Sequence, residues 1–280
     1  MAQPANSFTA LGGVQVLYDR LKPEHYGKTG IPYNFHCTQA AEDTFDALIK
    51  DLLGRTVPHF GPASAILSAG AWVSKPGQHG AGRAFDLDAI HWQHVKFVAL
   101  EQPQRTTLYL AVQAMCHKYC GVVLGYDYNP DHHDHLHVDI SRDVRFRTTQ
   151  SVVQFVQGAL ITLFNHAIEV DGEWGDQTEQ ALAATLTTIG IANVTTVNNW
   201  KRFLDTVCDT AVARVTAEIA ADALVDPHGA AIALGAALDI PAPAGQLLGA
   251  ARTSRPHTGR IDLNYKPFPN WAVYPKTVAG

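Results

Sequence analysis

The stretch Asp131–Asp139 reads DHHDHLHVD and holds four histidines in nine residues. Apolar and polar residues alternate from Leu136 to Ile140, which predicts a strand. His135 and His137 are two residues apart, so on a regular strand their side chains point to the same face. One of them can bind a metal ion while the other stands beside it as an acid, a base or an oxyanion partner.

A second motif lies upstream, where residues 79–86 read HGAGRAFD. His79 precedes a glycine-rich turn in which the backbone can bring a ligand in from a loop. Asp86 lies in the alternating stretch 85–90, a predicted strand, and supplies a hard oxygen ligand. With His137, these residues give two imidazoles and one carboxylate, which leave one tetrahedral position open as in catalytic zinc sites. Histidine-rich runs can also be surface features, but the two motifs together favour zinc.

The composition is typical of a folded globular protein, with 280 residues, 46% of them hydrophobic and 17% charged. The formal net charge of −5 gives no basic stripe, so we expect no nucleic-acid partner. The first residues lack the basic and apolar regions of a signal peptide, and no apolar run reaches the ~18 residues of a membrane span.

Four cysteines permit three disulfide pairings, between which the sequence does not choose. Cys116 and Cys120 are four residues apart, which favours small hydrophobic side chains on one helix face over a metal motif. The other two are Cys37 and Cys208.

The periodicity predicts an α+β fold with a small, mainly antiparallel sheet that carries the zinc site and has flanking helices, over residues 1–145. A polar linker at 142–149 leads to a mostly helical domain at 150–225 and an extended C-terminal arm at 226–280. We expect helices at 40–53 (ending at Gly54), 106–118, 152–164, 176–187 and 198–223, and strands at 65–73, 85–90, 121–125 and 136–140.

Two quoted motifs resemble a known family. The first is GRAFD at 82–86, which follows His79, and the second is VLGYDYN at 123–129, followed by His132, His135, His137 and Asp139. Both resemble the extensin-like C-terminal domains of bacteria and, more broadly, the superfamily of lysostaphin, D-Ala-D-Ala carboxypeptidase and hedgehog-type zinc peptidases. The resemblance covers residues from about 60 to 142.

The resemblance implies that His79, Asp86 and His137 are zinc ligands, and that the general base is His135 or Asp134. We favour His135, because a regular strand turns Asp134 to the opposite face; a bulge would reverse that choice. His132 matches a further family histidine that steadies the site or the transition state. We expect His133 to be exposed to solvent. Asp88 and Asp139 either orient ligand imidazoles or cap strand ends.

The sequence also departs from the family. Many members carry an upstream arginine that grips a terminal carboxylate, whereas residues 70–75 here read GAWVSK. Lys75, Arg83 and Trp72 are our candidates for substrate contacts. Endopeptidase cleavage, which needs no such clamp, is therefore at least as well supported as carboxypeptidase cleavage.

Residues 170–182, VDGEWGDQTEQAL, resemble a small helical peptidoglycan-binding module. Asp171 and Gly172 make a turn, Trp174 anchors the loop, and Thr178 opens the next helix. A helical scaffold without binding activity is the alternative interpretation.

Together the resemblances imply a zinc peptidase that cleaves stem or cross-bridge peptides of bacterial peptidoglycan, as an endopeptidase or a D,D-carboxypeptidase. Without a signal peptide, we expect it to reach the periplasm or cell wall by non-classical export or delivery, as an antibacterial effector or lysin. An immunity or delivery protein would then be a further partner. Two alternatives stay open: hydrolysis of another amide, and a catalytically inactive, zinc-stabilised wall-binding protein.

Overall fold

The computed structural model describes residues 2–18 and 32–225, which form a mixed α/β fold. One sheet has seven strands, of which six follow the order β2-β3-β5-β6-β9-β8, and β7 pairs with β6. Only the β3–β5 pair is parallel among the described strands, so the sheet is mainly antiparallel. The strands are β2 Ala10–Leu11, β3 Val14–Leu17, β5 Ala63–Gly70, β6 Ala84–Trp92, β7 Lys96–Val98, β8 Val122–Leu124 and β9 Leu136–Asp139.

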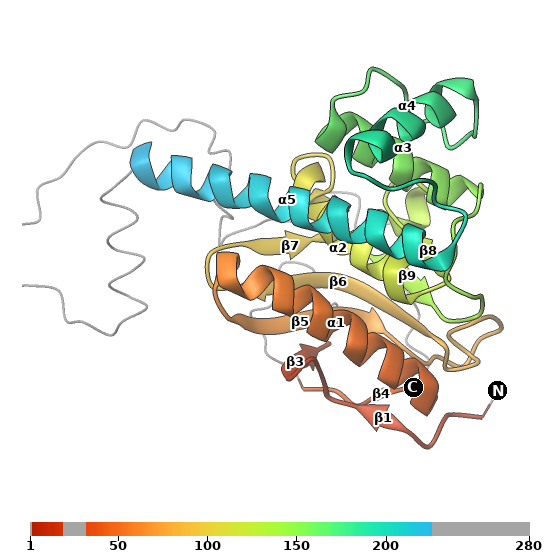
Figure 1. Cartoon of the computed structure of the whole chain (residues 1–280). Helices are drawn as coiled ribbons and strands as arrows, with labels where there is room; N and C mark the ends of the chain where they lie inside the picture. Colours follow the sequence, from red (N-terminus) through yellow and green to blue (C-terminus); the bar gives the residue numbers. More distant parts are fainter. Residues whose placement is uncertain (1, 19–31, 226–280) are drawn as a thin grey trace, which may run out of the picture.

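A smaller antiparallel pair joins β1 (Ser7–Phe8) to β4 (Phe35–His36). The described residues also form five α-helices: α1 Gln39–Phe60, α2 Thr106–Tyr119, α3 Gln150–Phe164, α4 Asp176–Thr188 and α5 Val197–Val225. Figure 1 shows α1 lying across the sheet, the long α5 running alongside, and α3 and α4 gathered at one end. No helix in the described ranges is long and apolar enough to cross a membrane.

Strand β6 positions the site because both of its faces are buried. Phe85 packs against Phe45 of α1, with 5.6 Å between the ring centroids. Successive side chains on a strand point to opposite faces, so Asp86 points away from the α1 layer. Asp86 is the register partner of His137 on β9. The two predicted ligands thus lie side by side on the sheet face opposite α1.

The expected end of the first helix at Gly54 is wrong. Helix α1 continues through Gly54 to Phe60 and ends at Gly61, which has φ of 75°. A glycine inside a helix costs only about 1 kcal/mol relative to alanine. Burial of Phe60 in the last turn, beyond Gly54, outweighs that cost, because a buried large apolar side chain contributes about 1.5–3 kcal/mol.

The helical segment packs directly on the sheet part. Buried Trp200 and Phe203 of α5 belong to the same apolar cluster as Phe45 and Phe85. Lys118 of α2 bridges Asp51 of α1 and Asp205 of α5, at 2.6 Å from each. A boundary near 145–150 stays a prediction, and the described parts on either side of it share a continuous core. The expected arm at 226–280 lies outside the described residues.

The four cysteines are all buried free thiols. Cys116 lies in α2 and Cys120 directly follows the helix. Burial raises the pKa of both thiols, which disfavours the thiolate form that binds metals. They behave as the small hydrophobic side chains that their spacing predicts.

Candidate metal centre

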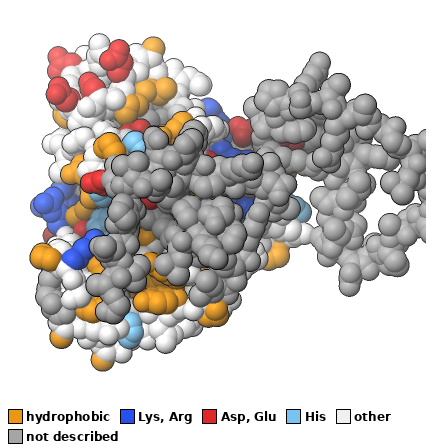
Figure 2. Space-filling model, turned by 180° about the vertical axis from the view of Figure 1, so that it is seen from behind, with side chains coloured by type: hydrophobic (Ala, Val, Ile, Leu, Met, Phe, Trp, Pro, Cys, Tyr) orange, Lys and Arg blue, Asp and Glu red, His pale blue; other side chains and the backbone are white. Residues whose placement is uncertain are grey.

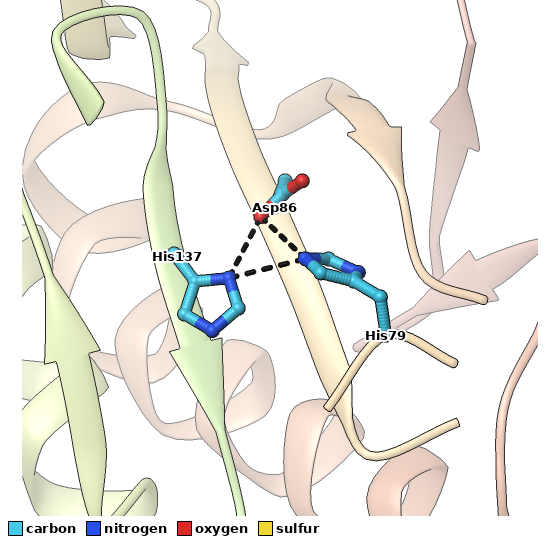
Figure 3. A group of neighbouring side chains, drawn as sticks. All are labelled: His79, Asp86 and His137. Atoms are coloured by element: carbon cyan, nitrogen blue, oxygen red, sulfur yellow. Dashed lines mark hydrogen bonds and ion pairs between the residues drawn. The ribbon is translucent and has the colours of Figure 1, made fainter. Parts of the chain in front are cut away.

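His79, Asp86 and His137 converge at one point, as Figure 3 shows. His79 comes from the loop between β5 and β6, Asp86 from β6 and His137 from β9. His79 Nε2, His137 Nδ1 and Asp86 Oδ1 lie 3.1 Å from one another along all three edges. His79 and Asp86 are each only 7% exposed. The structure therefore brings together the three residues predicted as ligands.

The outward-facing nitrogen of each imidazole has its own acceptor. His79 Nδ1 donates to the carbonyl oxygen of Ala71 at 2.5 Å, and His137 Nε2 faces Asp139 Oδ2 at 3.4 Å. In a neutral imidazole only one nitrogen carries a proton. With the outer nitrogens protonated, His79 Nε2 and His137 Nδ1 would turn their lone pairs toward a bound ion, an arrangement typical of metal-binding histidines. Without an ion, the same two atoms lie at hydrogen-bond distance from Asp86 Oδ1.

The spacing of these three atoms suits a small cation. A tetrahedral ion with bonds of about 2.0–2.1 Å separates its ligand atoms by roughly 3.3–3.4 Å, close to the 3.1 Å found here. Three lone pairs at this distance repel one another unless a cation or a proton lies between them. The cluster can hold a metal ion through two nitrogens and one oxygen.

The charges of the cluster point the same way. Burial by itself would raise the pKa of Asp86, but the charge of His135 and hydrogen bonds from His137 and His79 hold it well below its usual range. Burial would lower the pKa of His137, but hydrogen bonds to Asp139 and Asp86 raise it to about 9. In the metal-free protein His137 is therefore protonated at neutral pH. Its positive charge balances the charge of Asp86, as a metal ion would.

His135 lies at the edge of this cluster and forms a pair with Asp134. Its Nε2 is 3.5 Å from Asp86 Oδ1, and its Nδ1 donates to Asp134 Oδ1 at 2.6 Å. Strand β9 begins only at Leu136, so strand alternation does not apply to Asp134, which binds His135 instead of pointing to the opposite face. The two candidates for the general base are therefore joined by a hydrogen bond.

His132 ends the short 3-10 helix η3, Pro130–His132. Its ring lies 5.2 Å from that of His135 and 6.0 Å from that of His137, and its Nδ1 donates to Asn129 Oδ1 at 2.6 Å. Burial and the neighbouring charges of His135 and His137 lower the pKa of His132 to about 4. His132 is therefore a neutral side chain packed against the cluster at neutral pH.

His133 differs from its expected exposure to solvent. It is half-buried and stacks on Tyr126 with 4.3 Å between ring centroids. Its ring therefore packs on the segment that follows β8 rather than on the metal cluster.

The sequence allows two roles for Asp88 and Asp139: each could orient a ligand imidazole or cap the end of a strand. Asp139 is 3% exposed and faces His137 Nε2 with one oxygen while the other accepts from the backbone N–H of Ser141 at 2.8 Å. It therefore orients the ring of His137, one of the three residues that could hold a metal ion. Asp88 is fully buried in the middle of β6, where a bulge occurs against β5, so it does not cap a strand end.

Some contributors to the site give no signal in the sequence. The carbonyl of Ala71 is backbone and carries no residue-type signature. The segment that leads to His132 is also fixed by Tyr109 of α2. The Tyr109 hydroxyl accepts a hydrogen bond from the N–H of Tyr126 at 2.7 Å. Gln154 of α3 donates to the carbonyl of Asp127 at 2.7 Å. The helical part therefore supports the site loop.

The three candidate substrate contacts border the loop that carries His79. Lys75 and Arg83 are exposed, and Trp72 is half-buried. Among the described residues, none of their side chains forms a hydrogen bond or a salt bridge with the metal cluster. Their role in substrate binding stays a prediction.

Residues 63–150 match the family model described as Extensin-like protein C-terminus. The match runs from β5 to the first residue of α3 and contains His79, Asp86 and His137, as well as the Asp134–His135 pair. This segment is thus extensin-like, as its motifs predict. No curated protein and no solved structure matches the chain.

Proposed function

We propose that this protein is a zinc-dependent peptidase that cleaves stem or cross-bridge peptides of bacterial peptidoglycan. The observation that carries the proposal is the convergence of His79, Asp86 and His137, beside a hydrogen-bonded Asp134–His135 pair. Three protein ligands with one open position are typical of catalytic zinc, whereas structural zinc has four.

Zinc is the ion that best suits this donor set. Two imidazole nitrogens and one carboxylate oxygen, held buried at tetrahedral spacing, disfavour magnesium and calcium, which prefer oxygen ligands. Bound zinc would supply a polarised carbonyl and a water whose pKa is lowered to about 7.

The residues of the chain have distinct roles in this scheme. Asp134 holds the proton on His135 Nδ1, so the lone pair of Nε2 faces the cluster and accepts a proton from the attacking water. The water oxygen bonds to the carbonyl carbon, the carbon–nitrogen bond breaks, and His135 returns the proton to the leaving amine. Asp139 fixes the ring of His137, and His132 packs beside both histidines.

The assignment to peptidoglycan rests on the extensin-like segment and on the resemblance of residues 170–182 to a wall-binding module. In that loop Asp171 accepts from the N–H of Glu173 at 2.8 Å. Gln157 of α3 is 1% exposed and donates to Asp171 and to Thr178. These hydrogen bonds hold the loop against α3, and the next helix begins at Asp176 rather than at Thr178. Action in the periplasm or cell wall belongs to the same proposal.

A pair of variants tests catalysis against mere wall binding. We expect His135→Ala to fold, to retain one zinc ion and to lose cleavage of peptidoglycan sacculi by about 100- to 10,000-fold, the contribution of a general base. His133→Ala is the matched control, because His133 stacks on Tyr126, and it should retain cleavage. Equal activity of His135→Ala and the wild type would contradict the assigned base, and absence of cleavage in all three proteins would favour the binding role.

A further inference from the structure

The outer partner of His79 is itself fixed by a segment near the N-terminus. Ala71 and Trp72 share one peptide group, whose carbonyl accepts a hydrogen bond from His79 Nδ1 at 2.5 Å. The N–H of the same peptide group donates to the carbonyl of His36 at 2.9 Å. Because a peptide group is planar and rigid, His36 on one side sets the position of the acceptor that His79 meets on the other.

The far end of the same loop has a second attachment. The carbonyl of Gly82 accepts from the N–H of Thr38 at 2.8 Å. Between the two attachments the loop is closed by its own backbone, since the N–H of Gly82 donates to the carbonyl of His79 at 2.9 Å. His36 and Thr38 thus hold both ends of the loop that presents His79.

The residues that hold the loop belong to an N-terminal brace, which consists of residues 4–8 and 35–38. Strands β1 and β4 pair within the brace, and Figure 1 shows the pair next to α1. The N–H of Cys37 donates to the carbonyl of Asn6 at 3.2 Å. The segment 35–38 therefore lies between residues 4–8 on one side and the loop of His79 on the other.

The brace contacts the loop so closely that no side chain fits at Gly82. This glycine is buried and has φ of 65°. A methyl group added there would lie 2.6 Å from Cγ of Pro4 and 3.3 Å from the backbone nitrogen of Thr38, well inside van der Waals contact. Pro4 is held in turn by His36, whose Nδ1 donates to its carbonyl at 3.1 Å. Gly82 is therefore a point at which the brace and the loop touch.

Aromatic packing and hydrogen bonds attach the brace to the rest of the fold. The ring of Phe8 lies 5.6 Å from that of Phe35 and 5.9 Å from that of Phe85 in β6. Asn6 Nδ2 donates to Glu42 of α1 at 2.7 Å. Figure 2 shows acidic side chains gathered at the upper end of the molecule and mainly uncharged ones at the lower end, where Figure 1 places β1 and β4. The brace is therefore anchored independently of the loop of His79.

We propose that His36 and Thr38 are positioning residues for the metal centre, because they hold the loop that places His79 in the cluster. Both lie outside the extensin-like segment 63–150, so the metal site depends on residues beyond that segment. The inference deepens the proposed function and rests on it only for the identity of the ion, zinc. Its physical basis is preorganisation, since a ligand that is already in place loses less conformational freedom on binding.

Hydrogen exchange tests this coupling in the unchanged chain. The N–H groups of Trp72 and Thr38 make the two attachments, so their exchange rates report how often the loop separates from the brace. Coupling between two binding events is reciprocal, so we expect zinc to slow exchange at both groups by about tenfold or more. The N–H of Gly12 donates to Asp46 at 2.8 Å and is the control, whose exchange should change little.

Zinc affinity in three variants, measured by competition with a chromogenic chelator, tests the same contact. Gly82→Ala places a methyl group against Pro4 and Thr38, so we expect zinc binding about 10- to 100-fold weaker, as when a ligand imidazole loses its partner. Gly82→Ala/Pro4→Ala removes the nearest atom and should recover part of this loss. Gly13→Ala is the matched control, because Gly13 has φ of 79° but nothing within 4 Å of an added methyl group.

Two further readouts separate positioning of His79 from a general loss of stability. The absorption spectrum of the cobalt-substituted protein reports the arrangement of the ligands, and Gly82→Ala should alter it. Gly13→Ala should lose stability in urea without a change in this spectrum or in zinc affinity. If Gly82→Ala does not fold, His36→Ala takes its place. It removes the hydrogen bond to Pro4 without adding atoms, and we expect it to weaken zinc binding severalfold.

Two results would overturn the positioning role: equal zinc affinity of Gly82→Ala and the wild type, or unchanged exchange at Trp72 and Thr38 when zinc is added. Coupling between zinc and the brace, combined with sacculi that the zinc-loaded protein leaves intact, would keep this role and reject the peptidase. Chelator-sensitive cleavage of sacculi without such coupling would do the reverse.

Discussion

Asp134 accepts a hydrogen bond from Nδ1 of the adjacent His135 at 2.6 Å. The pair lies just before β9, and His135 Nε2 faces Asp86 Oδ1 at 3.5 Å. The sequence offered these residues as alternatives for one role. In the proposed function they take consecutive roles, because His135 lies nearer the cluster and Asp134 accepts a hydrogen bond from its Nδ1.

The Asp134–His135 pair should behave as one unit in a double-mutant cycle. We expect Asp134→Asn to lower kcat by about 10- to 100-fold, as loss of an orienting carboxylate does, and His135→Gln to lower it further. The double variant should be no worse than His135→Gln alone, because a residue that acts through another contributes nothing once that other is gone. If the loss of kcat in the double variant equals the product of the two single losses, Asp134 acts independently of His135.

Metal content tests the ligand set without any substrate. We expect the wild type to retain one metal ion per chain after dialysis and His79→Ala to lose it. Inductively coupled plasma mass spectrometry measures this metal content. His94→Ala, a change of an exposed histidine, should retain it. Asp139→Asn should keep the site but weaken zinc binding by about 10- to 100-fold, since it removes the partner of His137. Full zinc retention by His79→Ala would contradict the ligand set.

Metal binding should release protons in a defined pH range. In the metal-free protein the pKa of His137 is raised to about 9, so this ring is protonated at pH 7.5 and must lose a proton to bind a metal. The pKa of Asp86 lies well below its usual range, so Asp86 needs no further deprotonation. We expect about one proton released from His137 per ion at pH 7.5, and apparent affinity rising roughly tenfold per pH unit up to about pH 9. Calorimetry in buffers of different ionisation enthalpy measures this number, and a value near zero would contradict it.

Acid should weaken the fold through His117. This residue of α2 is 4% exposed, and its ring lies 4.7 Å from that of Phe155 and 6.3 Å from that of Trp200. Burial lowers its pKa to about 3, against about 6.5 in the unfolded chain. Between these values the unfolded state binds a proton that the folded state does not, so the free energy of unfolding falls as the pH falls.

We expect His117→Gln to reduce the pH dependence of unfolding between pH 6.5 and pH 4 by about 1.4 kcal/mol per pH unit. Urea unfolding at several pH values measures this slope. His94→Gln is the control and should leave it unchanged. An unaltered slope in His117→Gln would show that His117 does not contribute to acid sensitivity.

The sequence predicted the parts of the fold that have strong local signals. The strands that carry Asp86 and His137 form where predicted, and His79 lies on the loop before the glycine-rich turn. The bulge at Asp88 and the start of β9 after His135 were not predicted.

The short strands β1, β2, β3, β4 and β7 were missed. β1 and β4 pair with each other across about 27 residues, whereas β2 and β3 form a local hairpin over Gly12 and Gly13, a turn signal that the predicted strands did not include. The outer partner of His79 is a backbone carbonyl, and the support of the site loop by Gln154 requires tertiary packing. No residue pattern encodes either contact.

The most direct test of the central claim is digestion of purified sacculi by the zinc-loaded protein, with released fragments identified by mass spectrometry. We predict new peptide termini within stem or cross-bridge peptides that disappear with a chelator and return when zinc is restored. Intact muropeptides in the presence of one bound zinc ion per chain would contradict the account.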